Sequence, residues 1–148
     1  MTQPAILVLI INYNTSQLMQ KLVDSIAEDI EVAILIVDNA STDKTYMELE
    51  AVNDKRVHLL KSKINLGFTG GINFGLKHVI ENMPYIKYFL LFNPDALSTP
   101  HLIENLYRII ESDKNVAAVS PKILYPDGKP WYSGATLNIN KGKVYNNP

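Results

Sequence analysis

Short apolar runs alternate along this chain with segments whose apolar residues recur at helical spacing. The runs occupy residues 5–13, 32–37, 57–60, 86–92 and 116–119. Runs that are apolar at nearly every position are typical of strands buried on both faces of a parallel sheet. The pattern therefore predicts five strands in this order.

Four helical segments follow the first four runs. They are marked by Leu18, Leu22 and Ile26; by residues 41–53; by Ile72, Leu76, Val79, Ile80 and Met83; and by Leu102, Leu106, Ile109 and Ile110. Thr15 or Ser16 is the expected N-cap of the first helix. Thr99 followed by Pro100 is a typical start for the fourth. Strand and helix thus alternate about four times.

Such an alternation predicts an α/β fold with a mostly parallel sheet and helices on both faces. Right-handed crossovers place the carboxyl end of every strand on one rim, where open α/β sheets bind ligands. Residues 125–129 are typical of a turn between two short β segments, which predicts a small C-terminal β hairpin. The tail, residues 136–148, is polar and has no clear period. We expect a single domain over residues 1–148.

Composition narrows the class of protein. The chain is 47% apolar and 20% charged, as expected of a globular protein, and its formal net charge of -1 predicts no binding to nucleic acid. It has no cysteine, which excludes disulfides and thiolate metal sites. The first apolar run is too short to span a bilayer, and no basic segment precedes it as in a signal peptide. We therefore expect a cytoplasmic protein.

A carboxylate stands where the second strand is predicted to end. Asp38 lies in the string VDNASTD at residues 37–43. It could accept a hydrogen bond from the imide N–H of uracil or thymine, or from an exocyclic amine. The alternative is that Asp38 only caps the next turn, together with Asn39, Ser41 and Thr42.

The first strand ends in Asn12, Tyr13 and Asn14. Tyr13 offers an aromatic face and the two asparagines offer amides close to the same rim. The alternative for each is a polar strand end beside a core tyrosine. A ligand at this rim would meet both strand ends.

A glycine-rich segment, residues 65–75, surrounds the start of the third helix. Glycine allows close approach of a ligand, and a helix N-terminus favours a diphosphate through its free N–H groups. Two common phosphate motifs are absent, because Thr69 stands where a dinucleotide fingerprint needs glycine and Leu76 replaces the lysine of a P-loop. The alternative is a glycine-rich turn with tight helix–strand packing.

A second carboxylate, Asp95, follows the fourth apolar run in the sequence Asn93-Pro94-Asp95. Magnesium sites often use one or two protein carboxylates together with phosphate oxygens and water, so Asp95 alone is chemically sufficient. The alternative is an ordinary turn. The three histidines of the chain show no metal-ligand spacing.

These segments, in this order, resemble the inverting family 2 glycosyltransferases, and in particular their rhamnosyltransferase-like branch. The resemblance covers residues 6 to about 134 and implies a GT-A fold. It implies that Asp95 binds Mg²⁺ or Mn²⁺, with Asn93 replacing the first aspartate of the D-x-D motif found in many such enzymes. The implied donor-binding residues are Asn12, Tyr13, Asn14, Asp38, Ser41, Asn65, Gly67, Phe68, Gly71, Asn73, Asn93 and Asp95.

The resemblance also implies a reaction. A sugar would pass from a nucleotide diphosphate donor, of the dTDP-rhamnose or UDP-sugar type, to a saccharide or lipid-linked acceptor in cell-surface polysaccharide synthesis, with inversion. In this family the catalytic base comes from the second half of the enzyme, here beyond Pro148. We therefore expect a truncated chain without the acceptor half, with no catalytic base of its own and weak or no activity alone.

Other interpretations stay open. The chain could be a non-catalytic or degenerate nucleotide-sugar-binding module that a partner completes. A nucleotidyltransferase fits less well, because the first strand–helix turn has no basic glycine-rich motif. An uncovered apolar sheet edge would favour a homodimer, and a lipid-linked acceptor would favour peripheral association with the inner face of the membrane.

Overall fold

The computed structural model describes residues 5–26, 30–42 and 45–146. The chain divides into two compact units, Met1–Pro100 and His101–Pro148, which are considered in turn. The expectation of a single domain over the whole chain stays a prediction.

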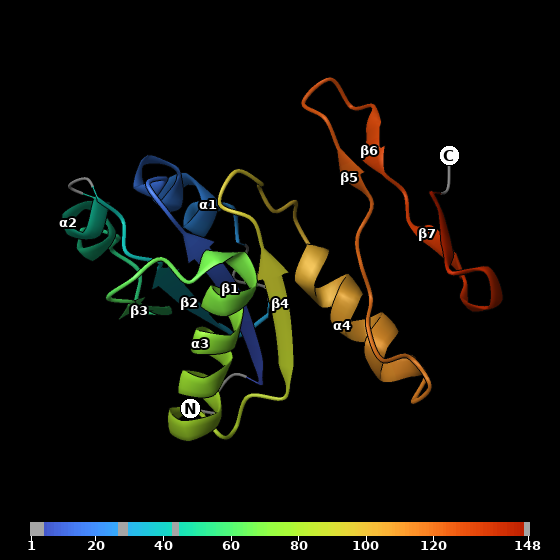
Figure 1. The fold of residues 1–148 in the computed structure, drawn as a ribbon, viewed down its shortest axis with the longest axis horizontal. Coiled ribbons are helices and arrows are strands. Elements are labelled where there is room, and N and C mark those ends of the chain that lie inside the picture. The colour runs from blue at the N-terminus through green and yellow to red at the C-terminus, as the bar shows by residue number, and fades with distance from the viewer. Residues whose placement is uncertain (1–4, 27–29, 43–44, 147–148) are drawn as a thin grey trace. The chain divides into compact units, whose positions relative to one another are not determined.

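The first unit is built on a sheet of four parallel strands in the order β3-β2-β1-β4 (Figure 1). Their bounds are β1 Ile6–Asn12, β2 Val32–Asp38, β3 Val57–Lys61 and β4 Tyr88–Phe92. Each connection returns the chain to the same end of the sheet, so all four strands finish on one rim. The predicted α/β fold with a parallel sheet is confirmed.

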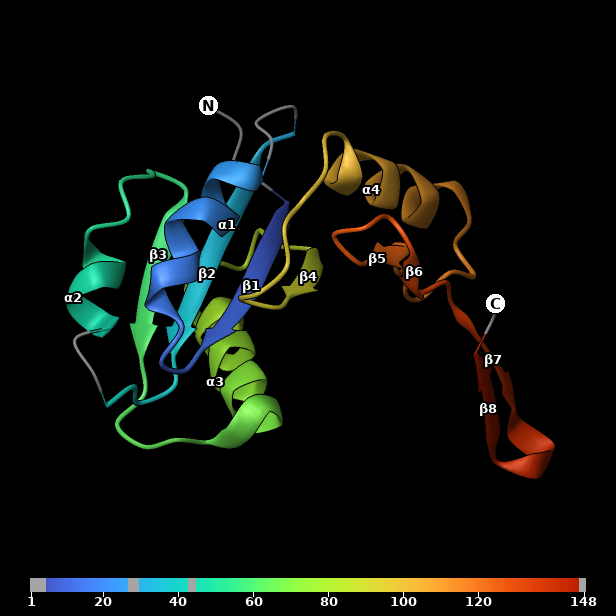
Figure 2. The same ribbon diagram turned by 90° about the horizontal axis from the view of Figure 1, so that it is seen from above.

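Helices cover both faces of this sheet, as predicted. The bounds of the helices in the first unit are α1 Met19–Ser25, α2 Thr45–Glu50 and α3 Gly67–Asn82. In Figure 2, α1 and α3 lie on opposite sides of the strands. Alternate side chains of the central strands explain this, because Leu7 and Leu9 pack in the cluster that includes Val79 of α3.

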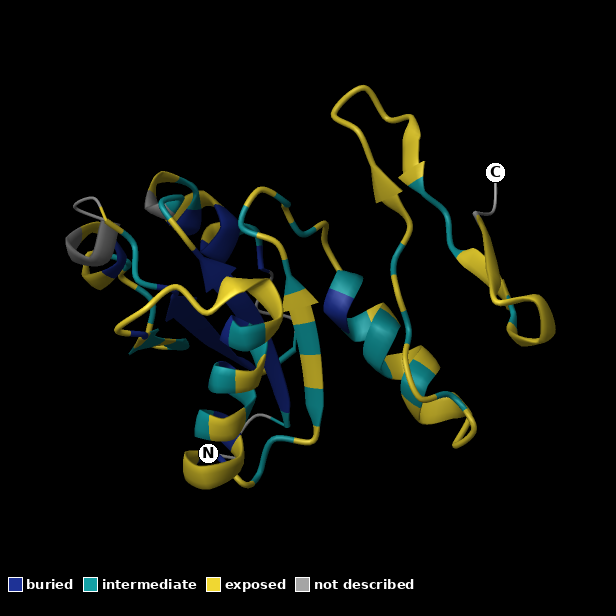
Figure 3. Cartoon of the chain, viewed as in Figure 1, coloured by how far each residue is buried: buried dark blue, intermediate teal, exposed yellow. Residues whose placement is uncertain are grey.

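The core is concentrated at the two central strands. Every residue of β1 and β2 is buried, whereas the edge strands β3 and β4 contain only partly buried and exposed residues (Figure 3). Phe89 and Leu91 of β4 are exposed. A central strand is covered on both faces and paired on both edges, so its near-continuous apolar sequence is what the position requires.

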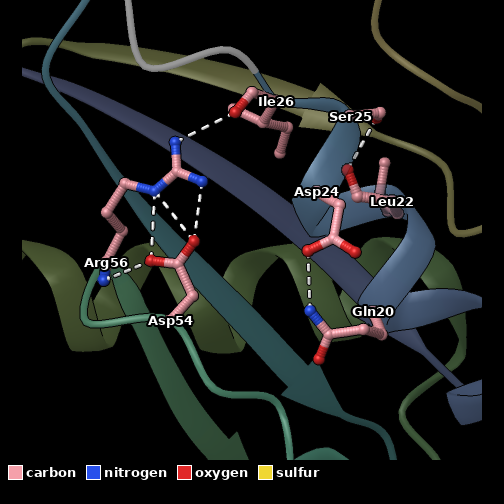
Figure 4. A network of polar contacts seen from close by, with 7 residues as sticks. All are labelled: Gln20, Leu22, Asp24, Ser25, Ile26, Asp54 and Arg56. Atoms are coloured by element: carbon pink, nitrogen blue, oxygen red, sulfur yellow. Dashed lines mark hydrogen bonds and ion pairs between the residues drawn. The ribbon is translucent and has the colours of Figure 1, made fainter.

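An ion pair closes the opposite end of the sheet from the carboxyl rim. The Arg56 guanidinium donates to Asp54 from Nε, at 3.1 Å to each carboxylate oxygen, and from Nη2 to Oδ2 at 2.7 Å (Figure 4). Its Nη1 donates to the backbone carbonyl of Ile26 at 3.0 Å, which ties the turn before β3 to the end of α1. The hydrogen bond from Arg56 lowers the pKa of the Asp54 carboxyl.

The second unit contains α4 Leu102–Ser112 and two small antiparallel hairpins. One hairpin pairs β5 Ile123–Leu124 with β6 Pro130–Tyr132, and its turn includes Gly128 at φ +82°. This confirms the hairpin predicted around residues 125–129. The other pairs β7 Ala135–Asn138 with β8 Lys143–Asn146 through the turn Ile139–Lys141. The tail, whose sequence showed no clear period, thus forms a hairpin of its own.

Three local predictions fail. No strand forms at residues 116–119, because no neighbouring strand in the described part of the chain offers them a backbone partner. Thr99 does not cap α4; the N-cap is His101, at φ +60° and without a side-chain cap bond. A 3-10 turn, Ser16–Leu18, precedes α1, so Leu18 takes the N-cap position expected for Thr15 or Ser16.

No helix among the described residues is both long and apolar enough to cross a bilayer. The predicted homodimer and the predicted membrane association stay predictions.

Candidate functional site

The candidate site lies on the carboxyl rim of the sheet, where β1 and β2 end and α3 begins. Asn12 and Asp38 are the last residues paired between β1 and β2. The pairing continues one step further, since the amide of Asn39 donates to the carbonyl of Asn12 at 2.9 Å. Polar side chains from the end of β1, the end of β2 and the loop before α3 meet at this place.

Asp38 is the most unusual group there, because it is a carboxylate only 1% exposed. Its Oδ1 accepts hydrogen bonds from the Ser41 hydroxyl, from the Ser41 amide at 3.3 Å and from Asn12 Nδ2 at 3.4 Å. Its Oδ2 is buried and has no hydrogen-bond partner in the described part of the chain. A buried acceptor without a partner is costly, which makes this oxygen a candidate for a hydrogen bond from a ligand.

Asn12 and Ser41 hold Asp38 rather than facing outward. Asn12 is fully buried, and its Nδ2 donates to Asp38 and, at 3.3 Å, to the Ser41 hydroxyl. Its Oδ1 accepts from the Thr15 hydroxyl at 2.7 Å. The amide groups of Asn12 are thus occupied within the protein, which makes it a residue that orients the carboxylate.

Asn14 links the loops after β1 and β2. Its side-chain Oδ1 accepts from the backbone amide of Thr42 at 2.9 Å. Its backbone amide donates to the Ser41 hydroxyl at 3.0 Å. The backbone of Asn14 is at φ +55° and that of Ala40 at φ +61°, a left-handed region that asparagine adopts readily but that costs energy for alanine. Of these two loops, backbone strain is therefore confined to the one after β2.

The start of α3 offers backbone donors that no side chain in the described part of the chain caps. Its N-cap is Leu66, whose side chain cannot accept a hydrogen bond, and no side-chain cap bond is formed. The Leu66 amide donates to Asn39 Oδ1 at 2.9 Å and the Gly67 amide to Asn65 Oδ1 at 2.8 Å. A helix start has four N–H groups without helical partners, so the two that remain belong to Phe68 and Thr69. Both residues are exposed, and the positive end of the helix dipole lies there.

The glycines of α3 serve two purposes. Gly67 has φ +69°, a conformation that a side chain would strain. A Cβ on Gly71 would lie 3.0 Å from Ile11 Cγ2, and one on Gly75 would lie 2.9 Å from Leu9 Cδ1. The latter two therefore let the helix pack closely on β1, as the packing interpretation of this segment predicted. Contact between Gly71 and a ligand stays a prediction.

The other predicted donor-binding residues are exposed. They are Tyr13, Asn65, Phe68, Asn73, Asn93 and Asp95. Asn65 has its Oδ1 engaged by the Gly67 amide and by Asn39 Nδ2 at 3.1 Å, which leaves its own Nδ2 as a donor. Phe68, at 57% exposed, presents a large aromatic ring beside the free N–H groups.

Asp95 follows β4 in a turn in which the Ala96 amide donates to the Asn93 carbonyl at 3.2 Å. Among residues 5–26, 30–42 and 45–146 no group of three or more His, Asp or Glu side chains is placed to hold a metal. An exposed single carboxylate still fits Mg²⁺ or Mn²⁺, because such ions take most of their ligands from phosphate and water. Metal binding by Asp95 stays a prediction.

Sequence reasoning missed one residue of the site, Asn39. It was considered only as a cap for the following turn, yet it is 2% exposed and reaches the loop before α3. Its place directly after Asp38 at a buried strand end was the available signal. The contacts themselves join residues 26 to 28 positions apart, which no local pattern reveals.

Comparison with known proteins matches residues 7–147 to the family described as glycosyl transferase family 2. A protein of Haemophilus influenzae named "Uncharacterized glycosyltransferase" is 28% identical over 120 residues, which cover 78% of this chain and 36% of that protein. The low-salt glycan biosynthesis hexosyltransferase of Haloferax volcanii is 28% identical over 123 residues, which cover 83% of this chain and 38% of that protein. The chain thus spans less than two fifths of either relative.

The family match covers nearly the whole chain, and the parallel α/β sheet with a polar site on its carboxyl rim agrees with it. The chain belongs to glycosyl transferase family 2.

Proposed function

We propose that this chain binds the donor of an inverting, rhamnosyltransferase-like glycosyl transfer, with the nucleotide base at Asp38 and the diphosphate at the start of α3. The observation that carries the proposal is the buried Oδ2 of Asp38, which lacks a hydrogen-bond donor among the described residues. A base bound there would supply that donor. The cost of burying the carboxylate in the empty protein would then be repaid on binding.

The free oxygen also favours one class of base. Only Oδ2 is available, because Oδ1 already accepts from Ser41 and Asn12. Uracil and thymine present a single imide N–H between two carbonyls, which matches one free acceptor. Guanine presents two adjacent donors and would need both carboxylate oxygens. A dTDP- or UDP-linked sugar therefore fits better than a GDP-linked one.

The diphosphate fits the start of α3. The amides of Phe68 and Thr69 and the positive end of the helix would bind phosphate oxygens, and Asn65 Nδ2 would add a donor. Asp95 would hold Mg²⁺ or Mn²⁺, and that ion would neutralise charge on the departing nucleoside diphosphate. The acceptor would be a saccharide or a lipid-linked saccharide, by analogy with a relative named for glycan biosynthesis.

Isothermal titration with dTDP, UDP and GDP in the presence of Mg²⁺ tests this proposal, with Asp38→Asn as the variant. An asparagine amide in place of Oδ2 would donate instead of accepting, so we expect binding of dTDP or UDP to weaken by at least about tenfold. Asp24→Asn is the matched control, because Asp24 is an exposed aspartate of α1, away from the rim, whose Oδ1 accepts from Gln20. Absence of binding by the unaltered chain, or equal binding by Asp38→Asn, would overturn the assignment.

A second candidate is a nucleotide-sugar-binding module that does not catalyse transfer. It is favoured by the way the site side chains are used: those of Asn12 and Ser41 bond to each other and to Asp38, so they hold the carboxylate in place rather than react. Release of nucleotide from a donor in the presence of an acceptor saccharide separates the two functions. Donor binding without such release would identify the chain as a binding module.

A further inference from the structure

Asn39 connects the two ends of the proposed donor site. It follows Asp38 directly, and its backbone amide is fastened to β1 through the carbonyl of Asn12. Its side chain crosses to the loop before α3. There Nδ2 donates to Asn65 Oδ1 and to the Gly67 carbonyl, both at 3.1 Å, and Oδ1 accepts from the Leu66 amide at 2.9 Å.

The side chain of Asn39 has little capacity left for a ligand. Both hydrogens of Nδ2 are donated within the protein, and Oδ1 already accepts one bond. The residue is also 2% exposed. Any influence of Asn39 on binding must therefore pass through the loop that it holds.

That loop decides where the free amides of α3 stand. Asn39 accepts the Leu66 N–H and donates to Asn65. Asn65 Oδ1 in turn accepts the Gly67 N–H. The N–H groups of Phe68 and Thr69 are then the pair available at the helix start. The preceding residue in the chain, Asp38, carries the free carboxylate oxygen. One buried amide thus joins the acceptor for a base to the donors for a diphosphate.

We propose that Asn39 is a positioning residue that sets the separation between the base end and the diphosphate end of the donor site. This inference rests on the proposed function, since it assumes that a nucleoside diphosphate occupies both ends. It differs from a purely structural role in one measurable respect. Loss of Asn39 displaces the helix start relative to Asp38 but leaves Asp38 with its own partners, Ser41 and Asn12.

The test compares nucleosides with nucleoside diphosphates on the full chain. Dissociation constants for thymidine and uridine, and for dTDP and UDP with Mg²⁺, are measured by NMR titration for the unaltered chain and for Asn39→Ala. We expect the nucleoside constants to stay within about twofold, and the gain in affinity from adding the diphosphate to fall by about tenfold. Asn82→Ala is the matched control, because Asn82 also donates to a carbonyl of α3, that of His78 at 2.8 Å, at the far end of the helix.

The outcomes separate the two proposals. If the unaltered chain binds neither dTDP nor UDP, the donor site itself is refuted, and this inference with it. If it binds them and Asn39→Ala weakens nucleoside and diphosphate equally, or changes neither, the donor site stands and the positioning role is refuted.

A second variant covers a failure of Asn39→Ala to fold. Asn39→Ser is too short to make the three bonds of Asn39, but it leaves a smaller cavity than alanine and adds no charge beside Asp38. It should therefore fold more readily and show the same selective loss of the diphosphate gain. Amide hydrogen exchange at Leu66 and Gly67 should accelerate in either variant while β1 and β2 stay protected. Unchanged exchange at both amides would contradict the positioning role of Asn39.

Discussion

The ends of β2 and β4 lie on the same rim of the sheet, yet they differ in almost every physical respect. At the end of β2, Asp38 and Asn39 are buried; the Asn12 side chain at the end of β1 holds Asp38, and the Leu66 amide in the loop before α3 holds Asn39. At the end of β4, Asn93 and Asp95 are exposed, and the turn is held by a backbone bond. The first end is organised before any ligand arrives, and the second is open.

This difference follows from the position of each strand in the sheet. β2 has neighbours on both sides, so the loops after β1 and β3 can reach its end and hold it. β4 is an edge strand, and β1 is its one neighbour among the described strands. A base recognised through one hydrogen bond needs a fixed acceptor. A metal site between a carboxylate and a diphosphate does not, because the arriving diphosphate supplies some of its ligands.

The largest expected effect tests the contrast in packing between the two strands. Leu35 of β2 is fully buried, and truncation in Leu35→Ala should lower the free energy of unfolding by about 2–5 kcal/mol through lost burial and a cavity. Leu91 of β4 is 51% exposed, and Leu91→Ala should cost less than about 1 kcal/mol. Urea denaturation of both variants measures the difference. Equal losses would show that β4 is as well covered as β2.

The second effect tests the contrast in binding. Asp95→Ala should remove the metal dependence of dTDP or UDP binding, with a loss of about tenfold in Mg²⁺ and none in EDTA, while thymidine and uridine bind as before. Asp38→Asn should weaken nucleosides and diphosphates together. Titrations with and without EDTA distinguish the two patterns. If Asp95→Ala also weakens nucleoside binding, the division into a base end and a metal end is wrong.

The smallest effect concerns the ion pair at the opposite end of the sheet, which should influence stability without influencing the rim. Arg56→Ala removes the bonds to Asp54 and to the Ile26 carbonyl and should lower the free energy of unfolding by about 1 kcal/mol. Nucleotide affinity should not change. Denaturation and titration of the same preparation provide both measurements, and a change in affinity would show that the two ends of the sheet are coupled.

The same ion pair predicts a pH dependence. Because Arg56 lowers the pKa of Asp54 below its ordinary value of 3.8, the folded protein holds this carboxylate ionised more strongly than the unfolded chain does. Its contribution to stability is complete above about pH 5 and is lost as the pH falls through 3.8 toward the lower folded pKa. Arg56→Ala should therefore lose less stability than the unaltered chain over this range in acid denaturation curves.

Much of the fold could be predicted from local pattern. The continuous apolar sequences of β1 and β2 specify buried parallel strands, and the alternation with helices specifies one rim for their ends. The same pattern failed at residues 116–119, which are as apolar as a strand but have no strand beside them in the described part of the chain. Apolar sequence favours a strand, and only a neighbour with free backbone groups completes it.

The candidate site shows the same division. The residue types and their order along the chain located the rim and identified the family, because motifs of contiguous residues are local properties. Oδ1 of Asp38 accepts locally from Ser41 but also from Asn12, 26 positions away, and Asn39 holds the start of α3 through bonds to residues 26 to 28 positions away. Those bonds depend on the register of β1 against β2 and on the close packing of α3 upon them, so only the tertiary structure could assign Asn12, Ser41 and Asn39 to the support of the site rather than to its surface.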